Sequence, residues 1–126
     1  PPKTAEDGST PCEEGASTVS IEMFKKTFED AGLKLPVINE GFFADIPDSK
    51  YPDKICFAFF DGDFYTSITD SFNKVYHKMV KGGIILVHDY EYAPFPGAKK
   101  ACDDFLNNKP EKVIKDIFGI GKIVKE

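Results

Sequence analysis

The sequence predicts an α/β fold with a mainly parallel sheet and an antiparallel hairpin at its carboxyl end. Apolar stretches alternate with amphipathic stretches along the chain, which is the order typical of a parallel sheet covered by helices. Residues 55–60 and 84–87 are apolar at every position, as expected of parallel strands that are buried on both faces. A shorter strand is expected at residues 35–38.

Three segments have apolar residues at helical spacing. The first predicted helix spans residues 20–32, where Ser20 can cap the amino end and Gly32 can end the helix. The second runs over residues 65–79 and is followed by a glycine pair, which we expect to separate it from the next strand. The third covers residues 98–108.

The last predicted element is the hairpin. Residues 113–118 and 123–124 are its expected strands, and the segment Gly119-Ile120-Gly121 between them supplies its turn. The chain therefore ends in antiparallel strands, in contrast to the parallel strands expected before them.

Length and composition limit the organisation of the chain. Its 126 residues fit one domain, which we expect over residues 18–126. Residues 1–17 contain almost no large apolar side chain and are expected to form a loop or a disordered tail. The net charge of −5 argues against a nucleic-acid or anionic-membrane surface, which needs a basic patch. No apolar stretch is long enough to span a membrane. Three widely spaced Cys suggest no disulfide framework, so the cytoplasm is the expected compartment.

Acidic residues follow both long apolar strands. Asp61 comes directly after the first strand, and His88 and Asp89 follow the second. Ligands of open parallel sheets bind outside the carboxyl ends of the strands, so we expect Asp61 and Asp89 to face the same crevice. Neighbouring carboxylates repel each other, and a divalent cation would offset this repulsion, with His88 as a third ligand. Such a cation could lower the pKa of a substrate hydroxyl and orient it.

A structural role is the alternative for each of these residues. Asp after a strand commonly caps the following helix or shapes a turn. Asp63 is expected to cap the helix that begins near residue 64 or 65. For Asp61 the two interpretations have equal weight, and for His88 its place beside Asp89 favours a site role. The chain contains no glycine-rich dinucleotide or phosphate loop.

Four segments, in their order and spacing, resemble the macrocin O-methyltransferase-like family of class I S-adenosylmethionine enzymes. They are residues 41–47 (GFFADIP), 61–67 (DGDFYTS), 82–90 (GGIILVHDY) and 96–105 (PGAKKACDDF). The resemblance implies a Rossmann-like sheet and methyl transfer from S-adenosylmethionine to a hydroxyl of a sugar or other small molecule. It also implies a Mg²⁺ ion held by strand-end acids.

The resemblance also implies roles for single residues. By position, Asp61 and Asp89 are similar to the metal ligands of the family, and Asp61 also to its general base and to a cofactor-binding residue. Gly41 and Phe42 resemble the strand end near the adenine of the cofactor. The family usually has Asp where this chain has His88. An imidazole favours a softer metal than Mg²⁺, or a metal-free site in which His88 acts as the catalytic base.

In the family, the glycine-rich cofactor loop and the ribose-binding acid lie on two strands that precede the helix at Ser20. Neither occurs in these 126 residues, so we expect the sheet to lack the first strands of the full fold. The strand at residues 35–38 would then lose its partners, and an enzyme made of this chain would need a second copy or a complementing chain. The alternative function is a non-catalytic remnant or interaction module. A metal-dependent hydrolase ranks last, because it would need further His or Asp ligands.

Overall fold

The computed structural model describes residues 1–13, 15–16 and 18–126, so residues 14 and 17 of the predicted amino-terminal loop lie outside the described part. The helices are α1 (Ile21–Asp30), α2 (Tyr65–Val75) and α3 (Pro96–Leu106), and the strands are β1 (Ile55–Phe60), β2 (Met79–Val87), β3 (Ile114–Lys115) and β4 (Gly121–Val124). Short 3-10 helices are η1 (Ala5–Asp7), η2 (Phe43–Asp45), η3 (Asp48–Lys50) and η4 (Tyr76–Lys78). None of the helices in the described part of the chain is long and apolar enough to cross a membrane.

The strands form one mixed sheet in the order β1-β2-β4-β3. β1 and β2 are parallel, whereas β4 is antiparallel to both β2 and β3. The α/β class and the carboxyl-terminal hairpin are confirmed. The expectation of a mainly parallel sheet is wrong for the described residues, because the hairpin supplies half of the strands and residues 35–38 supply none.

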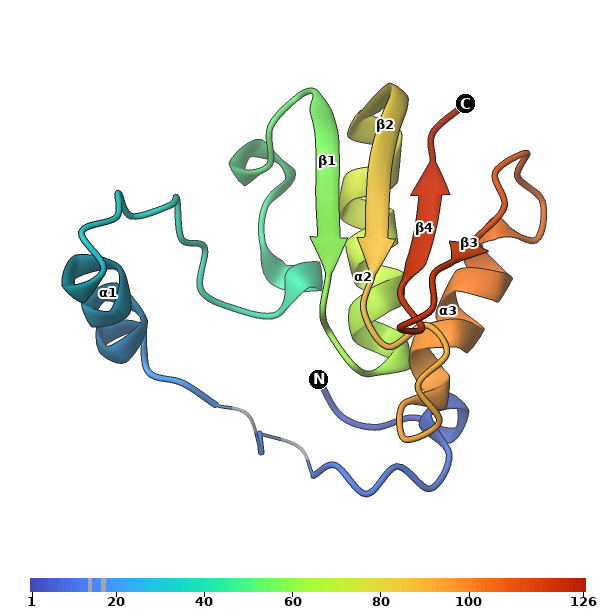
Figure 1. Cartoon of the computed structure of the whole chain (residues 1–126), viewed down its shortest axis with the longest axis horizontal. Coiled ribbons are helices and arrows are strands. Elements are labelled where there is room, and N and C mark those ends of the chain that lie inside the picture. Colours follow the sequence, from blue (N-terminus) through green and yellow to red (C-terminus); the bar gives the residue numbers. More distant parts are fainter. Residues whose placement is uncertain (14, 17) are drawn as a thin grey trace.

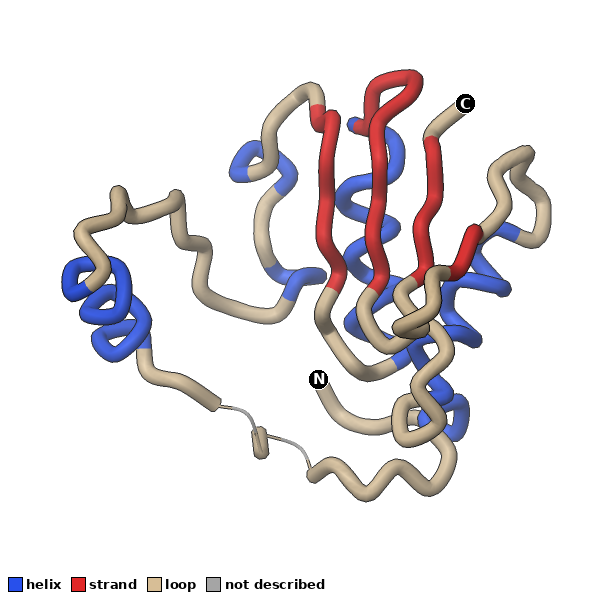
Figure 2. The backbone as a smooth tube through the Cα atoms, viewed as in Figure 1, coloured by secondary structure: helices blue, strands red, loops and turns tan. Residues whose placement is uncertain are grey.

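The strand predicted at residues 35–38 does not form. These residues have no strand pairing, and the side chains of Leu35 and Val37 are exposed. Figure 2 shows the segment between α1 and η2 as a loop. A strand needs a hydrogen-bonded neighbour, and the β-forming residues of this segment meet none among the described residues.

The second helix ends earlier than predicted, and the strand that follows it begins earlier. α2 stops at Val75, η4 follows, and β2 already begins at Met79. The glycine pair therefore lies inside β2 and does not separate it from the helix. Gly82 has a φ of +79°, and the pairing with β1 shifts between Met79 and Ile84. The glycines thus accommodate an irregularity within the strand.

Helices α2 and α3 cover the same face of the sheet (Figure 1). In the core between them, the ring of Phe72 stacks on Phe105 at 4.5 Å and meets the ring of Phe60 edge-on at 5.0 Å. On the opposite face, Phe57 and Phe59 are 55% and 48% exposed. The expected burial of β1 on both faces is therefore wrong for the described residues.

Helix α1 stands apart from the sheet (Figure 1), and none of its residues is buried. Its predicted boundaries are confirmed. The Oγ atom of Ser20 accepts a hydrogen bond from the backbone N–H of Met23 at 3.1 Å, and Gly32 follows the helix with a φ of +64°.

Candidate active site

The structure brings the predicted metal ligands together at the carboxyl ends of β1 and β2. Asp61 directly follows β1, and the backbone N–H of His88 donates to the carbonyl of Phe60 at 2.8 Å, which keeps the two strand ends in register. The Nδ1 atom of His88 lies 2.7 Å from Oδ2 of Asp89 and 3.1 Å from Oδ1 of Asp61. One potential ligand atom from each of the three side chains lies within 4.8 Å of the others. This Asp61–His88–Asp89 cluster is the strand-end cluster below.

The strand-end cluster is partly open to solvent. The side chains of Asp61 and His88 are 55% and 44% exposed, whereas that of Asp89 is only 10% exposed. Burial of the imidazole opposes its protonation, but the hydrogen bond to Asp89 and the negative charges of Asp89 and Asp61 raise the pKa of His88. Either a proton on His88 or a bound cation can therefore offset the negative charge of the two carboxylates. The proton and the cation would compete for Nδ1. Two carboxylates and one imidazole suit a divalent transition metal better than Mg²⁺, which prefers oxygen ligands.

Asp63 does not cap α2, so that prediction is wrong. The N-cap residue is Phe64, and no side chain of the N-cap accepts a hydrogen bond there. Asp63 has a φ of +59°, a conformation that no sequence pattern indicated. Burial and the charges of Asp89 and Asp61 raise the pKa of its carboxyl group. Asp63 therefore belongs beside the strand-end cluster, and only its Asp-Gly-Asp spacing from Asp61 pointed to it.

The residues predicted to bind a cofactor lie next to the loop that follows Asp61. Gly41 and Phe42 line a cavity of about 190 Å³ together with Gly62 and Ser67. A Cβ atom on Gly62 would lie 2.6 Å from Cβ of Ser67, so glycine is required for this close packing. Asp61 is not among the described residues that line the cavity, although it precedes Gly62 in the chain.

Comparison with known protein families decides the identity of the chain. The macrocin O-methyltransferase (TylF) family model matches residues 1–123. The chain belongs to the macrocin O-methyltransferase family. The resemblance carried by the sequence motifs is thereby confirmed. No curated protein matches the chain.

Solved O-methyltransferase structures share the fold of this family member. The O-methyltransferase NovP superimposes with a TM-score of 0.73 at 21% identity, over 95% of this chain and 55% of the NovP chain. CalS11, a TDP-rhamnose 3′-O-methyltransferase of calicheamicin biosynthesis, superimposes with a TM-score of 0.56 at 19% identity. The match covers 68% of this chain and 39% of the CalS11 chain. The chain thus spans about half of the length of NovP.

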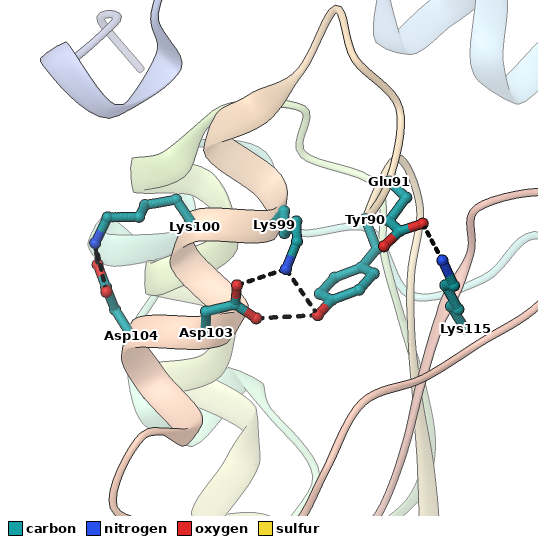
Figure 3. Close-up of polar contacts among 7 residues, drawn as sticks. All are labelled: Tyr90, Glu91, Lys99, Lys100, Asp103, Asp104 and Lys115. Atoms are coloured by element: carbon teal, nitrogen blue, oxygen red, sulfur yellow. Dashed lines mark hydrogen bonds and ion pairs between the residues drawn. The ribbon is translucent and has the colours of Figure 1, made fainter.

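A second, larger cavity of this macrocin O-methyltransferase family member adjoins Tyr90, next to Asp89. It measures about 570 Å³, and η1, the β2–α3 loop and α3 form its walls. Figure 3 shows the ion pairs that Glu91, Lys99 and Lys100 of its lining make. Nζ of Lys99 contacts Asp103 at 2.6 Å, and the hydroxyl of Tyr90 donates to Asp103 at 3.0 Å. Lys115 likewise contacts Glu91 at 2.7 Å. Its walls come from two parts of the chain that are far apart in sequence, η1 and residues 90–103.

Proposed function

We propose that this chain takes part in S-adenosylmethionine-dependent, metal-assisted methylation of a hydroxyl group on a sugar or other small molecule. The observation that carries the proposal is the strand-end cluster. Its acids and histidine converge at the carboxyl ends of two parallel strands, where open, Rossmann-like α/β sheets bind their ligands. Membership of the macrocin O-methyltransferase family supports the same reaction class.

Asp61, His88 and Asp89 would hold the cation in this proposal. When bound, a divalent cation lowers the pKa of a coordinated hydroxyl and fixes its orientation. Asp61 is the most exposed of the three side chains, so its carboxylate is the best placed to accept the proton of the acceptor hydroxyl. In a metal-free variant of the reaction, Nε2 of His88 takes that role, because Nδ1 donates to the neighbouring carboxylates, which also raise the pKa of the imidazole.

Gly41 and Phe42 are the proposed contacts for the adenine of S-adenosylmethionine. The ring of Phe42 is 56% exposed, which leaves its face available for stacking on a planar base. The cavity that these two residues line lies beside the loop after Asp61, so a cofactor there would approach the strand-end cluster.

The first test measures methyl transfer by the protein expressed from its complete reading frame. It is incubated with S-adenosylmethionine, a panel of glycosides and nucleotide sugars, and Mg²⁺, Mn²⁺ or Zn²⁺, with a chelator as the metal-free arm. We expect activity that Asp61→Asn lowers by about 10²–10⁴-fold, the usual contribution of a positioned base. Asp30→Asn is the matched control, because it removes an exposed carboxylate of α1, whose ion-pair partner among the described residues is Lys26.

A binding measurement distinguishes the methyltransferase from the alternative function, a non-catalytic interaction module. If the protein folds but titration calorimetry detects no S-adenosylmethionine binding, the chain acts as a non-catalytic interaction module. Equal loss of activity in Asp61→Asn and Asp30→Asn would contradict the role of the strand-end cluster.

A further inference from the structure

Asp7 is a buried carboxylate that the proposed chemistry does not use. It is only 1% exposed, although it lies in the amino-terminal segment that the sequence predicts as a loop. Its Oδ2 atom accepts hydrogen bonds from the backbone N–H and the hydroxyl of Thr4, at 2.8 and 3.1 Å. Its Oδ1 atom accepts the backbone N–H of Tyr65 at 2.7 Å, across 58 residues of sequence.

The contact with Tyr65 satisfies one N–H group at the amino end of α2. The first N–H groups of a helix have no partner within the helix, and Phe64 offers no side-chain acceptor. Asp7 supplies the acceptor and also a negative charge, which the helix dipole favours at this end. Because the loop of Asp61 and Asp63 enters α2 at this point, Asp7 fixes the far end of that loop.

Asp7 also touches the first turn of α3. A Cβ atom on Gly97 would overlap Oδ1 of Asp7 and lie 2.8 Å from the backbone nitrogen of Tyr65. The absence of a side chain at Gly97 therefore permits the contact. α3 is the helix that follows the loop after Asp89. One carboxylate thus lies between the starts of the two helices that follow the two strand-end motifs.

We propose that Asp7 is a positioning residue for the strand-end cluster. It holds the starts of α2 and α3 together, and through them the loops that carry Asp61 and Asp89 on either side of His88. The cation-binding consequence rests on the proposed function. The positioning of His88 does not, because it concerns the contacts of the imidazole in the metal-free protein.

Two variants break the Asp7 contact in different ways. Asp7→Ala removes the acceptor, whereas Gly97→Ala keeps Asp7 but fills its space, and alanine itself favours the helix. Asp7→Asn keeps one acceptor oxygen and is expected to have an intermediate effect. Tyr76→Phe is the matched control for lost stability, because it deletes a hydrogen bond to Glu111 that is remote in sequence from these motifs.

Two measurements are made at a temperature at which circular dichroism shows every variant to be folded. The first records the imidazole ¹⁵N resonances of His88 without metal. In Asp7→Ala and Gly97→Ala we expect them to move toward those of a free imidazole, with Tyr76→Phe unchanged. The second measures Mn²⁺ binding by water proton relaxation, and we expect about tenfold weaker binding in the same two variants, as for other residues that orient metal ligands.

Unchanged His88 resonances in Asp7→Ala and Gly97→Ala would overturn the inference, and so would an equal shift in Tyr76→Phe. If the wild-type protein binds no Mn²⁺ but its His88 resonances respond to both substitutions, the positioning role stands and the proposed metal role is wrong.

Discussion

In the proposed function, residue 88 would determine which cation suits the strand-end cluster. The imidazole of His88 places one nitrogen between two carboxylates, with 2.7 Å to Asp89 and 3.1 Å to Asp61. Nitrogen ligands favour transition metals, whereas Mg²⁺ prefers a set made of oxygens. A carboxylate at this position would therefore shift the proposed metal preference toward Mg²⁺.

His88→Asp is expected to strengthen Mg²⁺ binding by about tenfold and to weaken Zn²⁺ binding. The substitution also places three carboxylates together, so the metal-free variant should unfold at a lower temperature than the wild type. Calorimetric titration with each metal measures the affinities, and a thermal melt with and without Mg²⁺ measures the stability. His77→Asp, at an exposed position in η4, is the control. Unchanged metal preference in His88→Asp would show that His88 is not a ligand.

At the scale of secondary-structure elements, β1 is buried on one face only. Phe60 is 4% exposed and packs edge-on against Phe72, whereas Phe57, three positions earlier in the same strand, is 55% exposed. The alternation of a strand places these two rings on opposite faces of the sheet. Their contributions to stability should differ accordingly.

Phe60→Ala is expected to lower the free energy of unfolding by about 3–5 kcal/mol, the usual cost of deleting a buried aromatic ring. Phe57→Ala should cost less than about 1 kcal/mol, because its ring already contacts solvent over half of its surface. Urea denaturation followed by circular dichroism measures both values. A similar cost for the two substitutions would mean that the outer face of β1 is covered in solution.

Elements whose signals are local could be predicted from the sequence. The boundaries of α1 at Ser20 and Gly32 and the carboxyl-terminal hairpin depend on neighbouring residues, and the structure confirms them. The strand expected at residues 35–38 depends on a partner strand, which the described residues do not supply. The start of β2 at Met79 was missed for a similar reason, because pairing with β1 extends the strand past two glycines that locally favour a break.

The site likewise has features that the sequence could predict and features that depend on residues far apart in the chain. The convergence of Asp61, His88 and Asp89 follows from two parallel strands and their end residues, so topology alone could predict it. The position of Asp63 depends on a left-handed backbone conformation, and the large cavity beside Tyr90 depends on η1 and residues 90–103, which are far apart in sequence. Neither has a signature in a short stretch of sequence.

At the scale of the whole molecule, a second buried carboxylate ties the carboxyl end of the chain to the helical layer. Glu111 is 1% exposed and follows α3. It accepts hydrogen bonds from the hydroxyl of Tyr76 at 2.7 Å, from Nζ of Lys125 at 2.6 Å and from the backbone N–H of Glu126 at 3.2 Å. These contacts join η4 and the residues after β4 to the segment that follows α3.

The charge of Glu111 makes stability depend on pH in a defined range. Burial favours the neutral acid, but the hydrogen bonds from Lys125, Tyr76 and backbone amides outweigh it and lower the pKa of Glu111 to about 2. The usual pKa of 4.5 applies in the unfolded chain. Between these two pKa values the unfolded state binds more protons than the folded state. The stabilisation by the Glu111 carboxylate is therefore complete above the unfolded pKa and is lost as the pH falls toward 2.

Glu111→Gln is expected to remove this pH dependence. The wild-type protein should lose stability on the order of 3 kcal/mol through Glu111 as the pH falls from about 5 to 2, and the variant should lack this component at every pH. Urea midpoints measured at half-unit steps of pH give both curves, and their difference isolates the contribution of Glu111 from those of other acids. Asp30→Asn, which removes an exposed carboxylate, should leave the curve parallel to that of the wild type. If the curve of Glu111→Gln is also parallel, the pKa of Glu111 is the same in the folded and unfolded states, and the carboxyl end of the chain is held by packing rather than by this charge.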